Sequence, residues 1–66
     1  MRVTLDVAGG AVHELDAPEG TTWADLLSEV DLSPHEASVL VDGTPVPEDG
    51  EPETAEATVV RLVQGG

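Results

Sequence analysis

One segment of this chain repeats its apolar residues with the period of a helix, and it restricts the folds open to so short a sequence. These residues stand at i, i+3, i+4 and i+7, so they share one face of the helix: Trp23, Leu26, Leu27 and Val30. Thr22 precedes them and Asp25 follows Thr22 by three positions, which resembles a capping box with Asp in place of Glu. We expect one amphipathic helix of about 10 residues. Its apolar stripe must be buried against another layer, and the rest of the chain predicts a sheet.

Alternating apolar residues predict two strands before the helix. Residues 2–8 alternate cleanly, and residues 11–17 continue the pattern after a Gly-Gly pair, which is a hairpin signal. The larger apolar residues of the second segment, Val12 and Leu15, have opposite parity. We therefore expect either a β-bulge in this strand or a position at the edge of the sheet.

Three further strands are expected after the helix. The stretch ASVLVDG predicts a strand that ends in an Asp-Gly hairpin, and residues 44–47 return as a short strand whose prolines suit a sheet edge. Residues 57–63 predict the last strand, but its parity is ambiguous. If Arg61 faces solvent, Val60 and Leu62 are expected to face the core.

This order of elements predicts a two-layer α+β domain over residues 1–63, with residues 64–66 as a flexible C-terminal di-glycine tail. Four or five strands in a mixed sheet packed on one helix is the ubiquitin-like β-grasp arrangement. The chain has 66 residues and no cysteine, so neither a disulfide nor a Cys-ligated metal stabilises its small core.

The charge balance is strongly acidic: 14 acids face two arginines, there is no lysine, and the formal net charge is -12. Direct binding to nucleic acid is therefore not expected, since phosphate contacts need Lys and Arg. The apolar fraction is 39% and falls in regular patterns, which favours a folded domain over a disordered chain. We expect adaptation to high salt, where ions screen the repulsion between acids. A partner with a basic docking face stays open.

No apolar stretch approaches the length of a transmembrane helix, and the N-terminus lacks the apolar core of a signal peptide. We expect a soluble, cytoplasmic, monomeric protein that does not act at a membrane. His13 and His35 are too isolated in the pattern to predict a metal site, and solvated or capping roles suit them better.

The stretch DLSPHEASVLVDGTPVPED and the terminal RLVQGG resemble the small archaeal modifier proteins of salt-loving archaea, over the whole chain. These proteins are relatives of ubiquitin, of the ubiquitin-related modifier and of the bacterial sulfur carriers for thiamin and molybdopterin. The resemblance implies that the carboxylate of Gly66 is adenylated by a ubiquitin-activating-type enzyme, which uses the ATP, while this chain binds no cofactor. Gln64, Gly65 and Gly66 would form the tail, and the glycines suit a narrow channel because they have no Cβ.

The resemblance leaves two main fates open for the activated glycine. It is either joined by an isopeptide bond to target lysines, or converted to a thiocarboxylate that supplies sulfur for tRNA thiolation or molybdopterin synthesis. Relatives combine both. In either case the chain is a substrate and carrier with no catalytic residues. The implied partners also include sulfur-transfer enzymes and a desampylating metalloprotease. A non-conjugated interaction module is the third alternative.

Relatives dock their activating enzyme through a sheet face, which directs attention to Leu40, an apolar residue on the polar face of its predicted strand. We expect Val59, Arg61 and Val63 of the last strand to lie beside it and to complete an outward docking surface.

Overall fold

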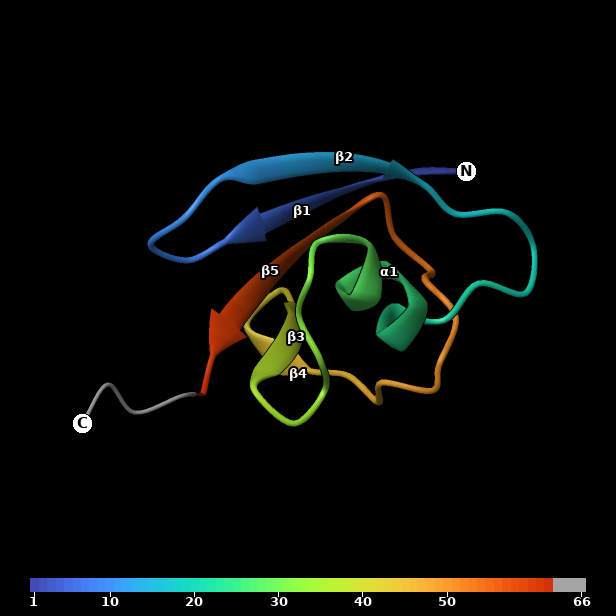
Figure 1. Ribbon diagram of the computed structural model, residues 1–66. Coiled ribbons are helices and arrows are strands. Elements are labelled where there is room, and N and C mark those ends of the chain that lie inside the picture. Colours follow the sequence, from blue (N-terminus) through green and yellow to red (C-terminus); the bar gives the residue numbers. More distant parts are fainter. Residues whose placement is uncertain (63–66) are drawn as a thin grey trace.

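The computed structural model describes residues 1–62, which form a five-stranded sheet with a helix packed against one of its faces (Figure 1). The elements follow the predicted order: β1 (Arg2–Val7), β2 (Val12–Asp16), α1 (Trp23–Glu29), β3 (Ala37–Val41), β4 (Thr44–Pro45) and β5 (Glu56–Arg61). The predicted α+β fold, a mixed sheet of four to five strands packed on one helix, is confirmed. Residues 63–66, which include the predicted tail, lie outside the described residues.

The last strand of the chain lies in the middle of the sheet. The strand order is β2-β1-β5-β3-β4, in which β5 runs parallel to β1 and antiparallel to β3. Val59 of β5 is thereby paired with Val7 on one side and with Val39 on the other. The sheet is mixed because the N-terminal hairpin and the C-terminal strand meet in its centre.

The core lies between the sheet and α1. Every second residue of β1, β3 and β5 contributes to it, and so do the apolar residues of the helical stripe. Within residues 1–62 no charged or polar side chain is buried. The buried residues are Val3, Leu5, Val7, Ala17, Trp23, Leu26, Leu27, Ala37, Val39, Ala57 and Val59.

The parity of the last strand, which is ambiguous in the sequence, does not follow the exposure of Arg61 as the conditional expectation had it. Arg61 is exposed, but Val60 is only half-buried and Leu62 is 50% exposed, whereas Val59 is 0% exposed. Arg61 has the parity of Val59, yet it stands at the end of β5, where its side chain reaches solvent. The parity follows from the pairing of β5 with two neighbours, and the sequence of β5 alone does not contain that information.

The opposite parity of Val12 and Leu15 is explained by the edge position of β2 rather than by a bulge. The register between β1 and β2 runs without a break from Arg2↔Asp16 to Asp6↔Val12. Leu15 packs on the core, while Val12 is 60% exposed on the other face. β2 pairs with a neighbour along one edge only, and α1 covers only one face of the sheet. An outward valine on the other face is therefore tolerated.

Both ends of α1 are closed by hydrogen bonds. At the start, Thr22 Oγ1 accepts from the N–H of Asp25 at 3.2 Å, and Asp25 Oδ2 accepts from the N–H of Thr22 at 3.0 Å. This is the predicted capping box, which is confirmed. A helix of seven residues is too short to be stable alone, so these bonds and the burial of its stripe hold it.

The helix is shorter than expected because Asp31 turns the chain into the left-handed region, with φ 62°. The N–H of Leu32 donates to the Leu27 carbonyl at 2.9 Å, and the N–H of Asp31 donates to the Ser28 carbonyl at 3.1 Å. This pair of bonds is a Schellman motif, in which the left-handed position is usually glycine. An aspartate there is conformationally strained, and its charge lies at the negative end of the helix dipole.

Replacing Asp31 by glycine should therefore stabilise the protein. We expect Asp31→Gly to raise the free energy of unfolding by about 0.5–1 kcal/mol, a shift of several degrees in Tm for a domain of this size. Asp31→Asn removes the charge but keeps a side chain that tolerates this conformation, so it separates the two contributions. Thermal melts followed by circular dichroism measure both variants, and a lower Tm for Asp31→Gly would contradict the strain at this position.

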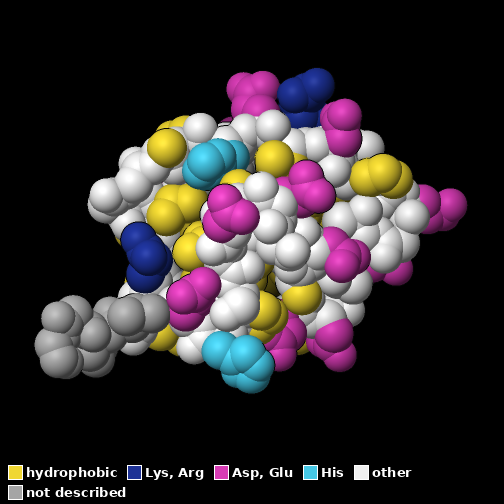
Figure 2. Space-filling view, in the orientation of Figure 1, with side chains coloured by type: hydrophobic (Ala, Val, Ile, Leu, Met, Phe, Trp, Pro, Cys, Tyr) yellow, Lys and Arg dark blue, Asp and Glu magenta, His cyan; other side chains and the backbone are white. Residues whose placement is uncertain are grey.

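The acids are spread over the surface with little compensation from cations. Acidic side chains are scattered across the face shown in Figure 2, with few Lys or Arg side chains among them. In the described part of the chain the ion pairs join Arg2 to Glu14 and to Asp16, each at 3.6 Å and each well exposed. Exposed pairs of this kind contribute little to stability. Repulsion between the remaining acids is therefore largely uncompensated.

We expect the folded state to depend on salt. The Debye length falls from about 30 Å at 0.01 M salt to about 3 Å at 1 M, so added salt screens the repulsion. The Tm should rise steeply between these concentrations, and the fluorescence of Trp23 should report the same transition. The triple variant Glu19→Gln, Glu48→Gln, Asp49→Asn removes three exposed charges and should melt at a higher temperature in low salt. A Tm that stays constant from 0.01 to 1 M salt would refute this expectation.

Candidate functional site

The chain leaves the sheet at a firmly held point. Strand β5 is paired on both sides, and its last residue, Arg61, lies opposite Ala37 of β3. The N–H of Leu62 then donates to the Glu36 carbonyl at 2.7 Å. Whatever follows Leu62 is therefore attached to the most central strand of the domain. The expected functional residues Gly66, Gly65 and Gln64, together with Val63, lie outside the described residues.

The sheet face opposite α1 carries the candidate docking surface. Leu40 is half-buried on this outer face, and the pairs Leu40↔Thr58 and Ser38↔Val60 place Val60 diagonally beside it. Diagonal neighbours on one face lie about 7–8 Å apart, within reach of apolar side chains. We call Leu40 and Val60 the outer patch.

Val59 does not belong to the outer patch, and this part of the predicted surface is wrong. Its side chain is fully buried because the registers with Val7 and Val39 turn it toward α1. Arg61 is exposed but has the parity of Val59, so the structure does not bring it beside Leu40 on the outer face. Val60 was missed, since the parity of β5 follows from its neighbouring strands.

A shallow hollow of about 400 Å³ lies beside Leu40 on the outer face. Three acidic residues line it: Asp6 of β1, Asp42 of the turn after β3, and Glu56 of β5. Neither Arg nor Lys is among the described residues that line it. Apolar contact at Leu40 within an acidic rim favours a partner that presents an apolar side chain between basic ones. The surface thus has the chemistry for docking a basic protein face.

The described residues carry few other candidate sites. Within residues 1–62 no group of three or more His, Cys, Asp or Glu side chains is placed to hold a metal ion. His13 lies on β2 opposite Leu5, and His35 is exposed in the turn before β3, so the two histidines stand on separate elements. In this same range no helix has the length and apolarity needed to cross a membrane.

Comparison with known proteins agrees with the fold. Residues 1–63 match the family model described as small archaeal modifier protein 2. The chain is 50% identical to small archaeal modifier protein 2 of Haloferax volcanii over 66 residues, which cover all of both chains. It also superposes on the crystal structure of a Haloferax volcanii small archaeal modifier protein 2, with a TM-score of 0.75, 48% identity and 97% of each chain covered. Members of this family are small modifier proteins and not enzymes. The chain therefore belongs to the small archaeal modifier protein 2 family.

Proposed function

We propose that this chain is a ubiquitin-like modifier that is attached to target proteins through Gly66. The carboxylate of Gly66 attacks the α-phosphorus of ATP on a ubiquitin-activating-type enzyme, and pyrophosphate leaves. A lysine amine of the target then attacks the glycine carbonyl, AMP leaves, and an isopeptide bond forms. The observation that carries the proposal is the 50% identity to a small archaeal modifier protein over both complete chains. Gly65 and Gly66 follow the central strand by only a few residues.

The position of Leu62 implies that the activating enzyme must contact the folded domain. Four residues follow Leu62 in the sequence, and four residues span at most about 14 Å when fully extended. The ATP site must therefore lie within that distance of the end of β5. We propose that the outer patch, Leu40 and Val60, with its acidic rim, is the surface that holds the domain there.

A charge placed on the outer patch should weaken activation. We expect Leu40→Glu to raise the KM of the modifier in ATP–pyrophosphate exchange by about tenfold, because it puts an unpaired carboxylate in an apolar contact. The matched control is Ser28→Glu, which adds the same charge at an exposed position of α1. In molar salt, where the added charge is screened, both variants should keep a Tm close to that of the parent protein. Equal KM values for the two variants would exclude Leu40 from the docking surface.

Digestion with trypsin offers a direct test of attachment. Trypsin cuts after Lys or Arg, and the last such residue in the chain is Arg61. A conjugated lysine should keep the remnant Leu62-Val63-Gln64-Gly65-Gly66, and trypsin should skip that lysine because its positive charge is lost. Mass spectrometry of conjugates, enriched through an N-terminal tag, should find this five-residue remnant, which a search for Gly-Gly alone would miss.

The control is a variant that lacks Gly65 and Gly66, which should yield no remnant on any lysine. Remnants that persist in this variant would overturn attachment through Gly66. Spectra of conjugates formed by an untagged protein, whose Met1 amine is free of the tag, show whether the modifier is attached to itself. The chain has no lysine, so the Met1 amine is its one ordinary acceptor, and this amine donates to the Ala17 carbonyl at 3.3 Å. We therefore expect single attachments, or at most chains linked through Met1.

Sulfur transfer is the second candidate function, and the relation of the family to ubiquitin-like sulfur carriers favours it. Hydrosulfide delivered by a sulfur-transfer enzyme would attack the carbonyl of the same adenylated Gly66, AMP would leave, and the resulting thiocarboxylate would serve tRNA thiolation or molybdopterin synthesis. Replacement of one oxygen by sulfur raises the intact mass by about 16 Da. Intact-mass measurement of protein purified from its own host, with the di-glycine deletion beside it, distinguishes this form from conjugates.

The proposal also names the proteins that act with this chain. They are a ubiquitin-activating-type enzyme that uses ATP, target proteins with accessible lysines, sulfur-transfer enzymes, and a metalloprotease that removes the modifier from its targets. All of these reactions would take place in the cytoplasm. The acidic rim of the outer face suits a basic surface on the first of these partners.

A further inference from the structure

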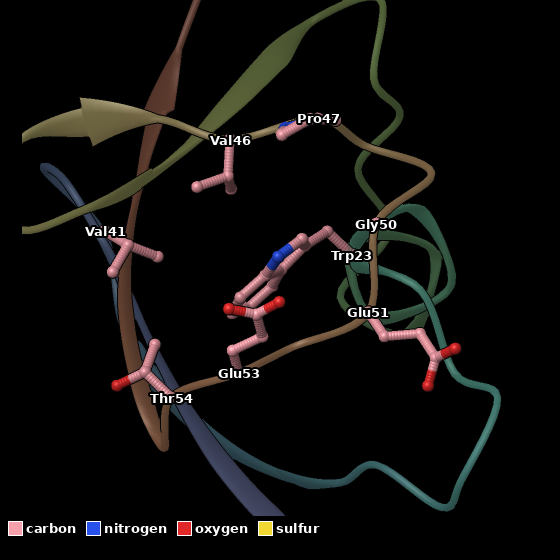
Figure 3. A pocket seen from close by; sticks show the side chains of 8 residues that line it. All are labelled: Trp23, Val41, Val46, Pro47, Gly50, Glu51, Glu53 and Thr54. Carbon is pink, nitrogen blue, oxygen red and sulfur yellow. The ribbon is translucent and has the colours of Figure 1, made fainter.

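A second hollow lies on the helix side of the sheet, away from the outer patch. It has a volume of about 430 Å³ and lies between the start of α1 and the loop that joins β4 to β5 (Figure 3). Val41 places it on the helix side, since Val41 has the parity of the buried Val39 in β3. Its apolar walls are the indole of Trp23, Val41, Val46 and Pro47. We call it the Trp23 hollow.

The Trp23 hollow is held open by backbone hydrogen bonds. The N–H groups of Trp23 and Ala24, at the start of α1, donate to the carbonyls of Gly50 and Glu48 at 3.0 and 2.8 Å. The N–H of Gly50 in turn donates to the Pro47 carbonyl at 3.1 Å. The loop is thus fastened to the helix at one side of the hollow, so the shape exists without an occupant.

The floor of the hollow carries an unused hydrogen-bond donor. Trp23 is 3% exposed, and its indole N–H has no hydrogen-bond partner in the described part of the chain. No side-chain donor or acceptor of residues 1–62 is both inaccessible to solvent and unpartnered. The indole N–H must therefore reach solvent, and the ring reaches into the hollow (Figure 3). The indole N–H can therefore donate a hydrogen bond to an acceptor atom of a bound molecule.

The rim of the hollow is negatively charged and lacks a cation of its own. Glu53 points into the hollow toward the indole, whereas Glu51 points away from it (Figure 3). Within residues 1–62 the carboxylate of Glu53 makes neither a hydrogen bond nor an ion pair, while Glu51 accepts from the N–H of Gly20 at 3.4 Å. Arg and Lys are absent from the described lining of the hollow. The charge of Glu53 is thus available to a ligand.

We propose that the Trp23 hollow binds an arginine side chain presented by a short segment of a partner protein. The methylene stem of arginine would lie on Val41, Val46 and Pro47, and its guanidinium would pair with Glu53 beside the exposed edge of the indole. A backbone carbonyl next to the arginine would accept from the indole N–H. Arginine fits better than lysine because its guanidinium is planar, is more weakly hydrated than an ammonium, and can donate two N–H groups to one carboxylate.

This interface is independent of the attachment chemistry. The Trp23 hollow and the outer patch lie on opposite faces of the sheet, so one partner on each can be bound at once. Salt screens the pair with Glu53 but does not weaken the contact between the arginine stem and the apolar walls. Binding should therefore persist at the salt concentrations that the acidic surface requires. Deletion of Gly65 and Gly66 should leave it unchanged.

The test uses the full-length protein, whose one tryptophan is the probe. Acetyl-Gly-Arg-Gly-amide is titrated into it while Trp23 fluorescence and the indole N–H resonance are recorded, at a salt concentration where the protein is folded. The neutral control peptide carries citrulline in place of arginine. Two matched variants each remove one negative charge from an exposed position. Glu53→Gln removes it inside the hollow, and the control Glu19→Gln removes it outside.

We expect a saturable change with the arginine peptide and a downfield shift of the indole N–H resonance. Glu53→Gln should weaken the affinity by about two- to fivefold, the range measured for exposed charge pairs, and Glu19→Gln should leave it unchanged. Equal affinity for the citrulline peptide would overturn the role of the charge. An equal loss in both variants, or the lack of a saturable change in the parent protein, would overturn the site itself.

Discussion

The double pairing of β5 is the constraint on which the rest of this structure depends. The last strand of the chain enters between β1 and β3. It contributes Val59, the most buried side chain of β5, to the core. Neither the N-terminal hairpin nor the β3–β4 hairpin has a complete sheet without it. The core therefore closes only when residues far apart in sequence meet, such as Leu5 and Ala57. A cooperative, all-or-none domain follows from this arrangement.

The same strand connects stability to function. The proposed tail follows the central strand closely, and Leu62, between the two, is held in place by the Glu36 carbonyl, next to the pairing of Arg61 with Ala37. An unfolded chain would present the same glycines, but without a fixed distance to the outer patch. A partner that contacts both the folded surface and the tail thus selects the folded modifier.

The acidic surface and the small core act in opposite directions. A chain with a net charge of -12 repels itself, while its core consists of eleven buried residues in the described part of the chain, three of them alanines. The outer patch and the Trp23 hollow are two places in the described part of the chain where apolar surface interrupts this charge. Each is bordered by carboxylates, so each favours partners that combine apolar and basic groups. Two such surfaces on opposite faces allow a very small protein to engage more than one partner.

Local features of this protein could be predicted from its sequence because their causes are local. The capping box at Thr22 and Asp25, the Asp42-Gly43 hairpin and the prolines at the edge strand act within a few residues, and all were found where expected. The helical stripe then required a sheet to cover it, which led to the α+β fold. The early end of α1 at Asp31 was missed, since aspartate enters the left-handed region less often than glycine.

The sequence by itself determined the order of the elements, the acidic surface and the two glycines that carry the proposed function. Only the tertiary structure decided which face of β5 is buried. As a result Val60, and not the expected Val59, lies beside Leu40 on the outer face. The tertiary structure also brought the loop after β4 onto the start of α1, which creates the Trp23 hollow from residues of three separate segments. The physical reason is the same in both cases. A strand with apolar residues at consecutive positions has no parity of its own, and a hollow exists only between segments that other contacts hold together.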